Sequence, residues 1–135
     1  MPAHLPDQIL VRSSEDLVRV RQAVRSRAVE LGFSLVDQTK IVTAASELGR
    51  NMLDHGGGEG TVSLEMLTAA GRHGLRLTFE DKGPGIPDID LAMREGYTTK
   101  GGLGLGLSGS RRLVNEFSLV SRVGEGTKVT IARWR

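Results

Sequence analysis

Apolar residues recur every three or four positions in two stretches of the first half of the chain, and this spacing predicts two amphipathic helices. The first helix is expected to begin near Ser13 and to stop before Gly32, which has the place of a C′ glycine. Its buried stripe comprises Leu17, Val20, Val24, Ala28 and Leu31. The second helix is expected over residues 34–55, with a stripe that comprises Ile41, Ala45, Leu48 and Met52.

Shorter apolar segments that alternate or cluster predict five strands. They cover residues 8–12, 61–67, 75–80, 118–123 and 128–134. Between the third and fourth strands we expect a short helix over residues 91–95 and a longer one over residues 105–117. This order predicts an α+β fold, a two-layer sandwich in which a mixed, mostly antiparallel sheet carries its helices on one face.

Composition narrows the class of protein. The chain has 135 residues, of which 39% are hydrophobic and 25% are charged, as expected for a single folded domain over residues 1–135. It has no cysteine, which excludes a disulfide framework and a catalytic thiol. We expect no signal peptide and no membrane segment, and hence a cytoplasmic protein. A net charge of +2 and five scattered aromatic residues argue against nucleic-acid binding.

Eight of the 18 glycines lie between Asp81 and Gly109, six of them in two clusters. In the first cluster, Asp81 follows an apolar strand and precedes Gly83 and Gly85. A carboxylate there can accept a hydrogen bond from an exocyclic amine while the glycines let a flat ring approach. The alternative is an Asx turn that caps the strand. The residue pattern alone leaves both open.

The second glycine cluster runs from Gly101 to Gly106 and leads into the predicted helix at residues 105–117. Backbone N–H groups at a helix N-terminus are suited to bind phosphate. Lys100 beside it either adds a charge to such a site or is simply solvated. Residues 104–109 match the G-x-G-x-x-G dinucleotide pattern, but no hydrophobic strand precedes them and too few residues follow for a Rossmann sheet. No P-loop motif is present.

Two polar residues lie on one side of the second predicted helix. Glu47 and Asn51 are four residues apart, so they project together. A carboxylate can act as a general base, and an amide oxygen is a ligand for a hard cation. The alternative is an ordinary polar helix face. Gly49 between them costs roughly 1 kcal/mol in a helix, and close packing would explain its presence.

Taken together, these segments resemble the GHKL (Bergerat-fold) ATPase and kinase superfamily over about residues 41–134. The resemblance rests on the N box at Glu47 and Asn51, on Asp81 with its glycines, on the glycine run at residues 101–106 and on Thr127 after Gly126. Within that superfamily, residues 79–89 and 95–99 are similar to the RsbT-type serine kinases of bacterial partner-switching and stressosome pathways. Anti-sigma-factor kinases are near relatives.

The resemblance implies a role for each site residue. Glu47 would be the catalytic base, and Asn51 would bind Mg²⁺. Asp81 would hold the adenine amino group of ATP, supported by Thr127. Gly83 and Gly85 would let adenine approach and would hinge a lid over residues 97–102. The remaining nucleotide-binding residues are Lys100, Gly101, Gly102, Leu103, Gly104, Leu105 and Gly106.

The implied function is that of an ATP-dependent protein-serine kinase. It would use ATP and Mg²⁺ to phosphorylate a serine of a small STAS-type antagonist protein in a stress-response or sigma-factor pathway. The alternative is an anti-sigma factor or phosphatase-activating binding protein that uses ATP mainly as a conformational ligand. A sigma factor and a PP2C-type phosphatase are further candidate partners, and the protein would be a monomer or homodimer.

Overall fold

The computed structural model describes residues 7–94 and 106–135. Nine helices and strands lie within these two ranges. In chain order they are β1 (Asp7–Val11), α1 (Ser14–Glu30), α2 (Leu35–His55), β2 (Gly60–Ala69), β3 (Arg72–Asp81), α3 (Ile89–Ala92), α4 (Gly106–Arg112), β4 (Glu116–Arg122) and β5 (Gly126–Trp134). No helix in these ranges is both long enough and apolar enough to span a membrane.

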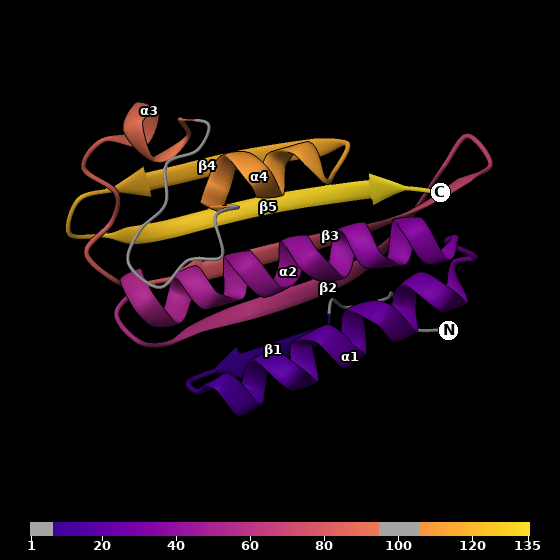
Figure 1. Cartoon of the computed structure of the whole chain (residues 1–135), viewed down its shortest axis with the longest axis horizontal. Helices are drawn as coiled ribbons and strands as arrows, with labels where there is room; N and C mark the ends of the chain where they lie inside the picture. Colours follow the sequence, from indigo (N-terminus) through magenta and orange to yellow (C-terminus); the bar gives the residue numbers. More distant parts are fainter. Residues whose placement is uncertain (1–6, 95–105) are drawn as a thin grey trace.

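The five strands form one sheet in the order β1-β2-β3-β5-β4, and each neighbouring pair is antiparallel. Three helices lie side by side on one face of this sheet, with α2 between α1 and the shorter α4 (Figure 1). The predicted α+β sandwich with helices on one face is therefore confirmed. Every pairing in the described part of the sheet is antiparallel, whereas a mixed, mostly antiparallel sheet was expected.

Several predicted boundaries were wrong by two residues or more, and two of these differences have a clear physical reason. The turn between β2 and β3 was expected over residues 71–74, but β3 already begins at Arg72. Ala70 and Gly71 both have positive φ, as in the two-residue turns that match the twist of a hairpin. The helix expected over residues 105–117 ends at Arg112. Phe117 lies in β4, opposite Ile131 of β5, because its side chain belongs to the sheet's apolar face.

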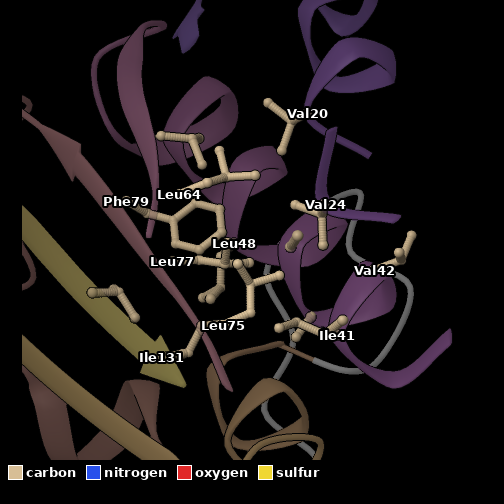
Figure 2. Close-up of a cluster of buried hydrophobic side chains, with 14 of the residues drawn as sticks. Val20, Val24, Ile41, Val42, Leu48, Leu64, Leu75, Leu77, Phe79 and Ile131 are labelled. Carbon is tan, nitrogen blue, oxygen red and sulfur yellow. The ribbon is translucent and has the colours of Figure 1, made fainter. Parts of the chain in front are cut away.

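The hydrophobic core lies between the sheet and the helices (Figure 2). α1 contributes Val20 and Val24, and α2 contributes Ile41 and Leu48. The sheet contributes inward-facing residues of its central strands, namely Leu64, Leu75, Leu77, Phe79 and Ile131. All of these side chains are buried, which supplies the main driving force for joining the two layers.

The start and the middle of α2 agree with the sequence analysis. The Ser34 hydroxyl accepts a hydrogen bond from the backbone N–H of Asp37 at 3.1 Å, as an N-cap does. At Gly49, a Cβ atom would lie 2.5 Å from Cδ2 of Leu17 in α1. The predicted reason for a glycine inside this helix, close packing, is therefore confirmed.

Replacing Gly49 with alanine is expected to lower the free energy of unfolding by about 1 kcal/mol. Alanine gains helix propensity of about 1 kcal/mol, but overpacking a core costs about 1–3 kcal/mol, and the buried Leu17 has little room to move. Urea unfolding of the variant measures the difference. Asp54→Ala, at an exposed position of the same helix, is the matched control. A more stable Gly49→Ala variant would show that α1 and α2 can move apart.

Candidate active site

The face of the sheet that carries the helices changes from apolar to polar at one end of three neighbouring strands. Rows of directly opposed apolar residues cross β3, β5 and β4. The row nearest the polar end consists of Phe79, Val129 and Leu119. The next row is Asp81, Thr127 and Ser121. Directly opposed residues of paired strands project from the same face, so these three polar side chains lie side by side. They are the sheet's contribution to the candidate site.

Asp81 is held at the end of β3 by backbone donors. Its Oδ1 accepts hydrogen bonds from the N–H of Gly83 at 2.9 Å and from the N–H of Thr127 at 3.3 Å. The first of these bonds closes an Asx turn, so that interpretation of the sequence is confirmed. Both bonds go to the same oxygen. The other oxygen, Oδ2, faces Gly56 just beyond α2, where a Cβ atom would lie 2.5 Å away.

The Asp81 side chain is only 9% exposed. Burial raises the pKa of its carboxyl, while the hydrogen bonds from Gly83 and Thr127 oppose this shift and the nearby Glu80 adds to it. A buried carboxylate beside a loop is a strong acceptor for a ligand's N–H groups, because water competes poorly there. The geometry is therefore compatible with the adenine-binding role that the sequence suggested.

Gly83 and Gly85 fit the loop tightly against the rest of the chain. A Cβ atom at Gly83 would lie 2.6 Å from the carbonyl oxygen of Gly56. At Gly85, where φ is +79°, a Cβ atom would lie 2.7 Å from the carbonyl carbon of Arg122. Both glycines are thus required by packing within the protein itself. Their expected roles in adenine approach and lid movement remain predictions.

Ser121 was not among the residues singled out in the sequence, and it links the loop to the sheet. Its hydroxyl accepts a hydrogen bond from the N–H of Ile86 at 2.8 Å and lies 2.7 Å from Oγ1 of Thr127. It also donates to the carbonyl oxygen of Gly126 at 3.2 Å. The alternation of Phe117, Leu119 and Ser121 along β4 could have indicated its face, but not its partners, which depend on the strand register.

Glu47 and Asn51 lie on the flank of α2 that faces away from α1. Gly49 contacts Leu17 of α1, and Glu47 is two residues from Gly49, or about 200° around the helix. This places the Glu47 and Asn51 row toward α4, the helix on the other side of α2 (Figure 1). The nine steps from Glu47 to Gly56 correspond to about 13 Å along the helix axis. Asp81 therefore lies near one end of the site and Glu47 near the other.

The Glu47 side chain is 5% exposed, and burial raises the pKa of its carboxyl, with Arg50 opposing the shift. A raised pKa makes a carboxylate a stronger proton acceptor than an ordinary exposed one. Asn51 is half-buried. The described residues contain no cluster of three acidic or histidine side chains for a metal. A single amide ligand suits Mg²⁺, which commonly keeps its waters and binds substrate phosphates.

The predicted phosphate-binding segment is described only at its end. Lys100, Gly101, Gly102, Leu103, Gly104 and Leu105 lie outside the described residues, as does the predicted lid over residues 97–102. Gly106 is the first residue of α4. α4 packs beside α2, so its first residue, Gly106, belongs to the helix that lies on the Glu47 and Asn51 side of α2.

Replacing Glu47 with glutamine is expected to raise the melting temperature at about pH 8. Because burial raises the folded-state pKa, stability is greatest when the carboxyl is protonated and falls as pH rises through that pKa. Glutamine carries no such cost. Thermal unfolding between about pH 4 and pH 8 should show that the gain in melting temperature becomes smaller as the pH falls toward the ordinary glutamate pKa of about 4.3.

Asp54→Asn, which neutralises an exposed carboxyl on the same helix, is the control for this prediction and should give no such gain. A Glu47→Gln variant that melts below the wild type at pH 8 would contradict the expected cost of the buried charge.

Comparison with known proteins agrees with this geometry. Residues 36–135 match the family described as "Histidine kinase-, DNA gyrase B-, and HSP90-like ATPase". The serine/threonine-protein kinase RsbT of Bacillus subtilis (strain 168) is 48% identical over 130 residues, which cover 95% of this chain and 97% of that protein. The anti-sigma F factor of Geobacillus kaustophilus (strain HTA426) is 31% identical over 126 residues, which cover 89% of this chain and 85% of that protein.

Two solved structures share the fold. The crystal structure of the RsbU and RsbW domains of a Mycobacterium tuberculosis protein matches 98% of this chain and 33% of its own chain, with a TM-score of 0.67 and 24% identity. The histidine kinase domain of the Erythrobacter litoralis EL346 blue-light activated histidine kinase matches 88% of this chain and 59% of its own, with a TM-score of 0.56 and 26% identity. The chain belongs to the family of histidine kinase-, DNA gyrase B- and HSP90-like ATPases.

Proposed function

We propose that this protein is an ATP-dependent serine/threonine-protein kinase of a partner-switching pathway. It transfers the γ-phosphate of ATP to a serine of a small STAS-type regulatory protein. The observation that carries the proposal is the 48% identity to a serine/threonine-protein kinase over nearly the whole of both chains. We place it in the cytoplasm as a single domain over residues 1–135.

The base of ATP is proposed to bind at the polar end of the sheet. Asp81 accepts a hydrogen bond from the adenine amino group, and Thr127, opposite Asp81 on β5, borders the same pocket. The hydrogen bonds from Gly83 and Thr127 hold the carboxylate in one orientation before the ligand arrives. Such preorganisation favours binding because little freedom is lost when the complex forms.

Catalysis is assigned to the flank of α2 that faces α4. Glu47 accepts the proton of the incoming serine hydroxyl, whose oxygen then bonds to the γ-phosphorus as the bond to ADP breaks. Asn51 holds Mg²⁺, which supplies charge neutralisation to the phosphates when bound. The backbone amides of residues 101–106 are proposed to bind the phosphates, and Lys100, which precedes them in the sequence, either adds a charge to this site or is solvated. These roles fit phosphoryl transfer, which depends mainly on positioning and charge stabilisation.

A second candidate function is supported by the anti-sigma F factor relatives, which are 28–31% identical over 84–91% of the chain. In that case the protein acts by binding a sigma factor or a PP2C-type phosphatase, and ATP serves mainly to set its conformation. The two functions differ in what becomes of the γ-phosphate. Kinase activity leaves it on a partner protein, whereas binding alone does not.

The purified protein is expected to transfer labelled phosphate from ATP to a STAS-domain protein only when Mg²⁺ is present. Glu47→Gln should reduce this transfer at least about 100-fold while leaving ATP affinity unchanged, because a general base contributes about 10²–10⁴-fold to the rate. Phosphate incorporation and equilibrium nucleotide binding are the two measurements.

Asp54→Asn on the same helix should behave as the wild type in both of these assays. Equal losses of transfer and ATP binding in Glu47→Gln would contradict the base role. Normal ATP binding without transfer to any STAS protein would favour the second candidate function.

Asp81→Asn is expected to weaken ATP binding by about tenfold to a hundredfold. The substitution replaces a charged acceptor with a neutral one, and a hydrogen bond to a charged group contributes about 1.5–3 kcal/mol. Isothermal titration calorimetry with ATP measures the effect. Glu80→Gln, one residue earlier on the opposite, exposed face of β3, is the control. Unchanged affinity in Asp81→Asn would mean that Asp81 only caps the strand.

A further inference from the structure

The hydroxyl of Ser121 has three polar neighbours. These are the N–H of Ile86 at 2.8 Å, Oγ1 of Thr127 at 2.7 Å and the carbonyl oxygen of Gly126 at 3.2 Å. A serine hydroxyl offers one hydrogen and two lone pairs, so three neighbours use its whole capacity. The way in which the hydrogens are shared among these groups follows from counting donors and acceptors.

The backbone partners fix the direction of each bond. The N–H of Ile86 can only donate, and it occupies one lone pair of Ser121. The carbonyl of Gly126 can only accept, so it takes the single hydrogen of Ser121. Thr127 must then donate its own hydrogen to the second lone pair of Ser121. In the reverse arrangement, with Ser121 donating to Thr127, the contact with Gly126 has no hydrogen. Only the first arrangement makes all three contacts hydrogen bonds.

This arrangement leaves Thr127 without a hydrogen for a ligand. Its Oγ1 retains two lone pairs, and its neighbour on the same face, Asp81, is a carboxylate. Both groups can accept hydrogen bonds, and neither can donate one when Asp81 is ionised. At this end of the sheet, the side chains of Asp81 on β3 and Thr127 on β5 therefore present only hydrogen-bond acceptors to a ligand. Ser121 is responsible for this at Thr127, because it accepts the hydrogen of the Thr127 hydroxyl.

We propose that Ser121 is a specificity-determining residue, which orients the Thr127 hydroxyl so that the base pocket selects a purine with an amine at C6 over one with a carbonyl there. This inference rests on the proposed function, since it assumes that the pocket binds the base of ATP. A 6-amino group donates two hydrogens to such acceptors. A 6-oxo group can only accept hydrogen bonds, so it cannot pair with the acceptors of Asp81 and Thr127. An acceptor that is buried without a hydrogen-bond partner is costly.

The test compares binding of ATP and inosine triphosphate, which has a carbonyl in place of the amine. Calorimetry with the wild type should show tighter binding of ATP. In Ser121→Ala the Thr127 hydroxyl is free to rotate and donate to the carbonyl, so the preference for ATP should fall about threefold to tenfold, the contribution of one neutral hydrogen bond. Ser121→Thr, which keeps a hydroxyl, should restore the preference.

Ser118→Ala is the matched control, because Ser118 lies on the same strand but on the exposed, opposite face of the sheet. If Ser121 serves only to hold the loop at Ile86, its loss weakens binding of both nucleotides by the same factor, and the unchanged ratio overturns the inference. Hydrogen exchange of the Ile86 amide provides a check without nucleotide. Protection in the wild type that is lost in Ser121→Ala supports the bonding pattern, and equal exchange in both contradicts it.

The inference and the proposed function fail in different ways. Wild-type protein that binds neither nucleotide overturns the proposed function, and the specificity role falls with it. Protein that binds ATP and loses affinity in Asp81→Asn, yet keeps its full preference for ATP in Ser121→Ala, overturns the role of Ser121 alone.

Discussion

The close approach of the end of α2 to the end of β3 determines the geometry of the whole site. Neither Gly56, just after the helix, nor Gly83, just after the strand, has space for a Cβ atom, because each lies against the other segment. This contact fixes Asp81 at one end of α2. The positions of Asn51 and Glu47 then follow from the helix, which has a fixed rise per residue. A site that spans two layers is thus held together by two residues without side chains.

Much of the fold followed from the sequence, because its signals are local. The apolar stripes of α1 and α2 and the alternation in the strands gave the order of the elements, and Gly49 predicted a close helix contact. The predicted end of α4 was wrong because Phe117 fits the spacing of a helix as well as that of a strand. Only its pairing with Ile131 distinguishes the two, and that pairing depends on chain segments that the local pattern does not include.

Single polar residues were easier to single out in the sequence than residues that act as a group, and the roles given to them remain predictions. Glu47 and Asn51 were singled out by their spacing on one helix face and Asp81 by its place after an apolar strand, whereas the burial of Glu47 and Asp81 is known only from the structure. Ser121 is an ordinary serine in a strand of alternating apolar and polar residues. It gains a role only because the strand register places its hydroxyl within hydrogen-bond distance of Thr127 and of the N–H of Ile86. Gly83 and Gly85 were associated with the ligand, whereas the structure shows that the protein's own backbone already needs them.

The polar row of Asp81, Thr127 and Ser121 is assembled from residues far apart in the sequence. Asp81 lies on the central strand β3, but Ser121 and Thr127 belong to the hairpin of β4 and β5. On the ribosome, a chain that has emerged only as far as α3 has Asp81 and the N box but neither Thr127 nor Ser121 beside Asp81. On the proposed function, nucleotide can stabilise the protein only after the hairpin of β4 and β5 has docked, since a ligand stabilises only the state that binds it. Cellular ATP would act late in biosynthesis, on finished molecules and not on nascent ones.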